Sequence, residues 1–135
     1  GSEMCIRDSM DIHRNNAFSL IAMEAAFNQG EEWLEQLLPY LSANFDYVVD
    51  YCAKHIPKIK TYAPDATYLM WLDCRGLGLD IEALRKFMIE KAGLGLNEGW
   101  TFSRSLDGFM RLNAACPRSV LERAMAQLEQ AVNAR

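Results

Sequence analysis

GFMRLNAACPRSVLERAM, residues 108–125, joins a strand-like run to a proline and the start of a helix. Successive side chains of a strand point to opposite faces of its sheet. Two sets of residues therefore face apart: Met110, Leu112 and Ala114 on one side, and Phe109, Arg111 and Asn113 on the other. The first set predicts a core face, which leaves Arg111 on a polar face beside an aromatic ring. After the proline, Ser119 and Glu122 form an S-x-x-E pattern, which predicts a capped closing helix.

Two helices are predicted before the first strand. Residues 17–28, AFSLIAMEAAFN, are apolar on nearly every side, which is typical of a helix that other elements cover. From residue 31 to residue 56, apolar side chains recur every three or four positions and predict a long amphipathic helix. Pro39 removes one hydrogen bond from that helix, so we expect a kink or a break near Leu38.

The rest of the chain predicts a small sheet with helices packed against it. The pattern gives four strands, near residues 58–62, 66–74, 94–97 and 108–114. Residues 66–74 are apolar on both faces, so we expect a central strand that is covered on both sides. Asp80 and Gly93 mark the start and the stop of a helix between the second and third strands. The fold class is α+β, with a mainly antiparallel or mixed sheet.

Composition excludes several classes of protein. The net charge of −4 offers no basic stripe for nucleic acid, and no apolar run reaches the length of a membrane helix. The four cysteines form no C-x-x-C pair, so their spacing predicts neither a zinc site nor a redox pair. The chain has 135 residues and 50% hydrophobic content, which predicts one soluble, cytoplasmic domain with free thiols.

Local motifs predict no catalytic or metal site. The glycine clusters RGLGLD and AGLGLNEG lack the spacing and the strand-to-helix context of a dinucleotide fingerprint. His13 and His55 are far apart and belong to no metal-binding pattern. No serine lies in a G-x-S-x-G turn, and the carboxylates fall mostly on predicted solvent faces. We therefore identify no catalytic residue and no metal ligand.

Arg111 is the candidate that remains, and two interpretations of it stay open. A guanidinium matches a carboxylate bidentately, which is how a protein can hold an amino acid by its α-carboxylate. The alternative is an ordinary half-exposed strand arginine, or one that pairs with Asp107 or Glu122. Spacing alone favours the ordinary arginine.

Three blocks of the sequence resemble a known family. They are SLIAMEAAFNQGEEWLEQLLPYLSANFDYVVDY, PDATYLMWLDCRGLGLD and GFMRLNAACPRSVLERAMAQL. In this order and register they are similar to the C-terminal portion of pyridoxal-phosphate-dependent carbon–sulfur lyases of the cystathionine β-lyase type. These enzymes are a branch of the fold-type I aminotransferases. The resemblance runs from about Asn16 to the end and covers the last third of such an enzyme.

The resemblance implies a division of the chain. Residues 1–9 show no periodicity, and we set them aside as a non-native leader. Residues 10–29 would be a helix from the end of the large, cofactor-binding domain. Residues 30–135 would be the small C-terminal domain. The large domain would be missing from this chain and would be its partner.

The resemblance also implies a substrate site. In the family, the arginine of a G-F-x-R-L-N block grips the substrate α-carboxylate, and Arg111 occupies the matching position. The loop LNEGWTF, residues 96–102, would line the mouth of the site. Asn97 and Trp100 in this loop, and Asn113 beside Arg111, are weaker substrate-binding candidates. The family's cofactor-binding motifs lie upstream of the match, so we expect no pyridoxal phosphate on this chain itself.

The implied reaction converts a cystathionine-like or cysteine-conjugate substrate to pyruvate, ammonia and a thiol, with pyridoxal phosphate in the complete enzyme. The chain alone is expected to be inactive and, with an uncovered apolar helix, to form a homo-oligomer. Two alternatives stay open. One is a fragment of an aminotransferase, and the other is a free-standing α+β module that binds a small carboxylate ligand or a partner protein.

Overall fold

The structure is a computed structural model that describes residues 16–135. The predicted leader, residues 1–9, and the first part of the predicted 10–29 helix lie outside the described residues. The chain divides into two compact units, residues 1–37 and 38–135.

The first unit contains helix α2 (Ala17–Gln29) and the beginning of helix α3 (Glu31–His55). Asn16 caps α2, since its side-chain oxygen accepts the Ser19 backbone N–H at 2.9 Å. The apolar side chains of α2 are exposed, Phe18 by 82% and Phe27 by 86%. The predicted helix is confirmed. The sequence predicted that other elements would cover its apolar side chains, but the described residues do not cover them.

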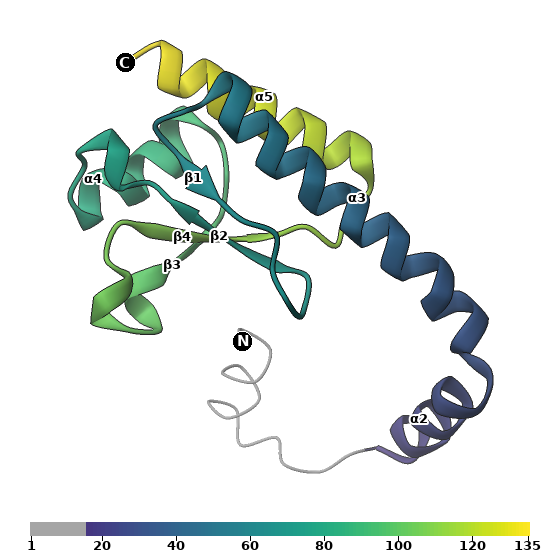
Figure 1. Cartoon of the computed structure of the whole chain (residues 1–135). Coiled ribbons are helices and arrows are strands. Elements are labelled where there is room, and N and C mark those ends of the chain that lie inside the picture. Colours follow the sequence, from purple (N-terminus) through teal and green to yellow (C-terminus); the bar gives the residue numbers. More distant parts are fainter. Residues whose placement is uncertain (1–15) are drawn as a thin grey trace. The chain divides into compact units, whose positions relative to one another are not determined.

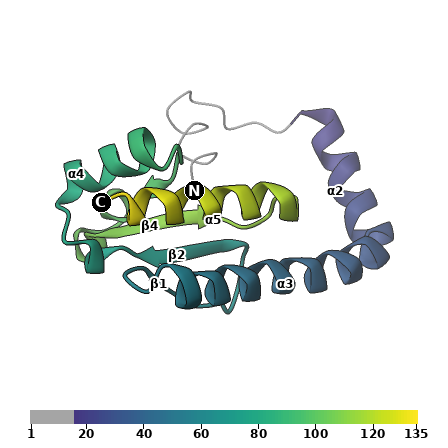
Figure 2. The ribbon, with the colours of Figure 1, turned by 90° about the horizontal axis from the view of Figure 1, so that it is seen from above.

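The second unit is a four-stranded antiparallel sheet with helices packed on one face (Figures 1 and 2). The strand order is β1-β2-β4-β3. In chain order the strands are β1 (Lys60–Thr61), β2 (Leu69–Asp73), β3 (Asn97–Glu98) and β4 (Phe109–Asn113). The helices are the rest of α3, α4 (Ile81–Lys86), which continues as a π-helical turn over Phe87–Lys91, and α5 (Arg118–Asn133). The predicted α+β class and its antiparallel sheet are confirmed.

Helix boundaries follow the local sequence with one exception. The Asp80 side chain caps α4 by accepting the Ala83 N–H at 2.8 Å, and α3 continues through Pro39 without a break. The predicted Ser119–Glu122 capping box is wrong, because α5 begins at Arg118 and Ser119 already lies inside it. The Arg118 N–H instead donates to the Tyr40 hydroxyl of α3 at 2.7 Å, so a distant side chain takes the place of a local cap.

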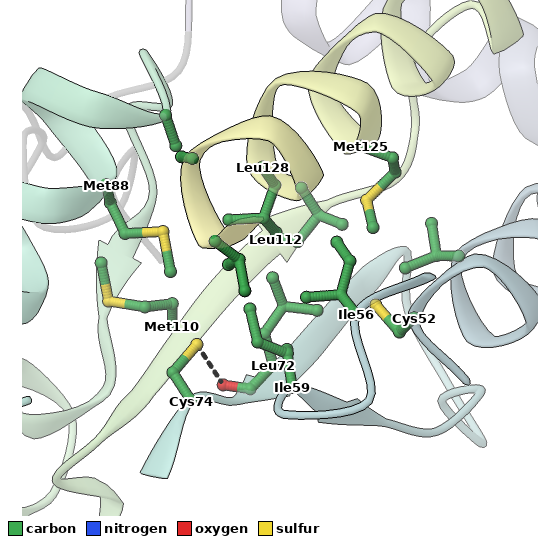
Figure 3. Close-up of a cluster of buried hydrophobic side chains, with 14 of the residues drawn as sticks. Cys52, Ile56, Ile59, Leu72, Cys74, Met88, Met110, Leu112, Met125 and Leu128 are labelled. Atoms are coloured by element: carbon green, nitrogen blue, oxygen red, sulfur yellow. Dashed lines mark hydrogen bonds between the residues drawn. The ribbon is translucent and has the colours of Figure 1, made fainter. Parts of the chain in front are cut away.

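The core lies between the helices and one face of the sheet (Figure 3). On β2 and β4 the alternation is regular, with Met70, Leu72, Met110 and Leu112 buried. These side chains pack with Cys52 and Ile56 at the end of α3, Met88 after α4, and Met125 and Leu128 on α5. The other face of β2 is only half-buried, so the prediction of a strand covered on both sides is wrong. The predicted central position of this strand is confirmed, since β2 lies between β1 and β4.

The buried side chain of Asn44 fixes the crossover from β4 to α5. Its amide nitrogen donates to the backbone oxygens of Ala114 at 2.9 Å and of Cys116 at 3.1 Å. Two carbonyls that would otherwise be buried without donors are thereby satisfied. Asn44 thus connects α3 to the segment that follows Arg111.

Helices α3 and α5 are also joined by a polar contact at their C-terminal ends. The Tyr51 hydroxyl donates to the Glu129 carboxylate at 2.5 Å, and His55 stacks on the Tyr51 ring. This hydrogen bond is the main cause that raises the pKa of Tyr51 to about 12. The protonated phenol is therefore favoured in the folded state.

In the connection between β3 and β4, backbone atoms pack closely around Gly99. This connection contains two 3₁₀ turns, η3 (Gly99–Thr101) and η4 (Arg104–Leu106). A Cβ at residue 99 would collide with the backbone oxygen of Leu106 and come within 2.9 Å of that of Phe109. The loop therefore needs glycine at this position, because no side-chain movement would relieve contacts with backbone atoms.

No helix within residues 16–135 combines the length and the apolar character that a membrane span requires. Within the same residues, Cys52, Cys74 and Cys116 are free thiols.

We predict a pH-dependent contribution of Tyr51 to stability. Its folded pKa, about 12, exceeds the value of about 10 expected when unfolded. The contribution is therefore complete below about pH 10 and is lost as the pH rises towards 12. In urea unfolding between pH 8 and 11.5, the free energy of unfolding should decline less with rising pH for Tyr51→Phe than for the wild type.

Tyr62→Phe is the control, since that side chain is 77% exposed. The buried thiols of Cys52 and Cys74, whose pKa values burial raises to about 11 and about 12, are present in every variant and cancel in the difference. Equal pH profiles for wild type and Tyr51→Phe would contradict the assignment.

We predict that Gly99→Ala lowers the free energy of unfolding by about 1–3 kcal/mol, because the added methyl group overpacks the loop against backbone. Gly95→Ala is the matched control: a Cβ there meets nothing within 4 Å, and the change should stay within about 0.5 kcal/mol. Denaturant unfolding of both variants measures the difference. A Gly99→Ala protein as stable as Gly95→Ala would show that the loop adapts freely.

Candidate functional site

The candidate site lies on the open face of the sheet, around Arg111 at the middle of β4. Antiparallel pairing sets Arg111 directly across from Trp71 on β2 and from Asn97 on β3. Directly paired residues place their side chains on the same face. Trp71, Arg111 and Asn97 therefore form a row across three strands, opposite to the face that holds the core.

An aromatic stack surrounds the Arg111 side chain. The Cζ atom of Arg111 lies 4.4 Å from the centre of the Phe102 ring, which comes from the loop between η3 and η4. The Phe102 ring meets Trp71 edge-on, with ring centres 5.8 Å apart and an interplanar angle of 81°. The guanidinium is therefore held between a strand and a loop by a cation–π contact.

Arg111 has an unused hydrogen-bonding capacity. Its Nε atom is buried, and no residue in the described part of the chain accepts a hydrogen bond from it. Within residues 16–135, no carboxylate forms an ion pair with Arg111; neither Asp107 nor Glu122 is such a partner. Among the described residues the Arg111 guanidinium therefore has no carboxylate partner for its charge, which is what a ligand carboxylate could supply.

Arg75 on the same face provides a direct comparison. Its guanidinium also lies over an aromatic ring, that of Phe109 at 4.8 Å. Unlike Arg111, it donates two hydrogen bonds of 2.8 Å to the Asp73 carboxylate. This bidentate pair holds the pKa of Asp73 below its usual range. Two arginine–aromatic pairs thus share the face, and only the one at Arg75 has its carboxylate within the described residues.

The structure brings together some of the sequence-predicted site residues and separates others. Asn97 lies beside Arg111 in the register, and Asn113 follows two residues later on the same face. The Asn113 side-chain oxygen accepts the Ala115 N–H at 2.8 Å, so it also turns the chain after β4. Trp100 donates from its indole nitrogen to Glu98 at 2.7 Å.

Glu98 pairs in register with buried Met110, and its Oε1 atom lies 3.3 Å from the Nε atom of Arg85 on α4. Trp100 also lines a small pocket with Ile81 and Leu84 of α4. Trp100 thus contacts Glu98 and lies near α4, and no hydrogen bond or aromatic contact within residues 16–135 joins it to Arg111.

Sequence reasoning missed Trp71 as a part of the site, and it included Phe102 only within the loop of residues 96–102, without a contact to Arg111. Trp71 appeared only as an apolar strand residue, and Phe102 only as one aromatic among several in a loop. The pairing register and the loop conformation bring them to Arg111, and neither can be obtained from alternation within one strand. An aromatic residue nine positions before the arginine was the available signal.

Lysines do not complete a cofactor site in the described residues. Every lysine of residues 16–135 is exposed. A lysine that forms a Schiff base needs a lowered pKa, which burial or a neighbouring cation provides. Burial of that kind is absent from the described lysines.

Comparisons with known proteins give a consistent result. No family model matches the sequence. Protein MalY of Escherichia coli (strain K12) is 40% identical over 119 residues, which is 88% of this chain and 30% of that protein. The cystathionine beta-lyase PatB of Bacillus subtilis (strain 168) is 35% identical over 118 residues, 87% of this chain and 30% of its own length.

Solved structures agree. The crystal structure of cystalysin from Treponema denticola, which contains a pyridoxal 5′-phosphate cofactor, superposes with a TM-score of 0.87 and 30% identity. The match covers 95% of this chain and 32% of cystalysin. The chain thus spans about a third of the length of the proteins it matches. The chain is thus homologous to proteins that include a cystathionine beta-lyase and cystalysin, and it corresponds to a C-terminal portion of them.

Proposed function

We propose that this chain supplies the substrate-carboxylate site of a carbon–sulfur β-lyase, with Arg111 as the residue that binds the α-carboxylate. The observation that carries the proposal is the contrast between Arg75 and Arg111. Arg75 has a bidentate carboxylate partner, whereas Arg111 is held in place with no such partner among the described residues. An amino-acid carboxylate would provide the missing charge and two acceptors.

The proposed reaction breaks a carbon–sulfur bond of a cystathionine-like substrate and yields pyruvate, ammonia and a thiol. Pyridoxal phosphate, held by the rest of the protein, would act as the electron sink. The role of Arg111 is to fix the position of the substrate, since orientation alone contributes a large part of many rate enhancements. Asn97 and Asn113 lie on the same sheet face as Arg111, which supports the proposal that they contact the substrate's polar groups.

We also propose that α2 belongs with the part of the protein outside this chain, as the end of the large domain, and that residues 30–135 form the small domain. The apolar side chains of α2, such as Phe18, Ile21 and Phe27, are exposed. A helix that is apolar on every side is typical of a buried position. In the complete protein that cover would come from the large domain.

The function is tested in the complete protein encoded by the full reading frame. Arg111→Ala should lower kcat/KM for pyruvate release from cystathionine by about 30- to 150-fold, since hydrogen bonds to charged groups contribute roughly 2–3 kcal/mol. Arg75→Ala is the matched control, with a change of at most about threefold. Equal losses in the two variants would contradict the proposal, and amino transfer to a keto acid without thiol release would indicate an aminotransferase.

The role of α2 is tested with the chain itself. Light scattering should find an oligomer, because exposed apolar surface of this kind associates in water. A Phe18→Ser/Phe27→Ser variant should shift the population towards the monomer, while Tyr62→Ser, at another exposed aromatic position, should not. A monodisperse wild-type monomer would contradict the expectation.

A further inference from the structure

The guanidinium of Arg111 lies over an aromatic ring, with its Cζ atom 4.4 Å from the centre of the Phe102 ring. We propose that Phe102 is the positioning residue of the carboxylate site and that it presets Arg111 for binding through its two terminal nitrogens only. The inference rests on the proposed carboxylate-binding role of Arg111. Beyond that role, we assign the residue that orients the guanidinium and the edge of the guanidinium that the ligand carboxylate contacts.

The binding edge follows from the accessibility of the guanidinium. A planar guanidinium can hold a carboxylate bidentately along two kinds of edge: side-on, through Nε and one terminal nitrogen, or end-on, through both terminal nitrogens. The Nε atom of Arg111 is buried, so a ligand carboxylate cannot reach the first edge. The end-on edge is the one that remains for an amino-acid carboxylate.

The orienting role of Phe102 follows from the comparison with Arg75. Two hydrogen bonds that Arg75 donates to the Asp73 carboxylate fix the plane of its guanidinium, so the Phe109 ring is a secondary support there. No carboxylate in residues 16–135 does this for Arg111. The ring of Phe102, 4.4 Å from Cζ, is the group that defines the guanidinium plane.

Trp71 in turn supports Phe102. Its ring contacts Phe102 edge-on, a favoured geometry for aromatic pairs, and it lies across from Arg111 in the sheet. Phe102 itself is 45% exposed and belongs to no buried cluster, so its replacement leaves the core intact. A change at Phe102 therefore reports on Arg111 and not on global stability.

The experiment uses the nitrogen-labelled full chain and the NMR signals of the arginine side chains. Without ligand, Phe102→Leu should speed hydrogen exchange at the Arg111 Nε–H at least about fivefold, while Phe102→Tyr should keep it within about twofold. Phe109→Leu is the matched control, because it removes the ring under Arg75 and should leave the Arg111 signal unchanged. An unchanged rate in Phe102→Leu, or an equal effect of Phe109→Leu, would overturn the proposal.

Binding is probed with acetate against chloride at constant ionic strength. Acetate should shift the NMR signals of the terminal nitrogens of Arg111 without a new downfield shift of the Nε–H signal. Phe102→Leu should lower the affinity for acetate about two- to fivefold. A strong Nε–H shift would show side-on binding and overturn the assigned edge.

Failure of the two proposals can be told apart. If acetate perturbs no Arg111 nitrogen, or binds Arg111→Lys equally well, the carboxylate site itself is overturned. If binding depends on Arg111 but is equal in wild type and Phe102→Leu, only the role of Phe102 is overturned. Rescue by Phe102→Tyr supports the ring as the active feature.

Discussion

The pairing of β2 with β4 is the constraint on which the rest of this structure depends. Five residue pairs in antiparallel register fix which side chains face the helices and which face outward. A slip of one residue would exchange Met110 for Arg111 in the core, at the cost of burying a charge. The same register that builds the core therefore delivers Arg111 to the open face, across from Trp71.

Much of this arrangement could be predicted from the sequence, since it depends on local patterns. Alternation in residues 109–114 correctly assigned Arg111 to the polar face, and Asp80 correctly marked the start of α4. Two predictions failed because distant contacts decided the outcome. Tyr40 of α3 satisfies the first N–H of α5 in place of Ser119, and no layer in the described residues covers the outer face of β2. The position of Phe102 over Arg111 depends on a loop closed around Gly99, which periodicity does not describe.

Arg75 and Arg111 each make an arginine–phenylalanine contact, but the two contacts differ in how the charge is neutralised. Each guanidinium packs on a phenylalanine ring of the same sheet face. At Arg75 the charge is neutralised by Asp73, two residues earlier in the chain, so the pair is complete in itself. At Arg111 the neutralising partner is absent from the described residues, and the positive charge is available at a fixed place. Relatives of the chain are about three times longer than the part that it matches.

The core holds sulfur atoms at several of its central positions. Met70, Met88, Met110 and Met125 are at most 2% exposed and pack in one cluster with Cys52 and Cys74. Methionine fills irregular space with a flexible, polarisable chain, so the sheet and α5 can shift slightly without opening a void. The thioethers are also the groups that oxidants convert to polar sulfoxides, which a packed core cannot accommodate. While the domain stays closed these atoms are shielded, so the rate at which a mild oxidant modifies them measures how often the layers separate.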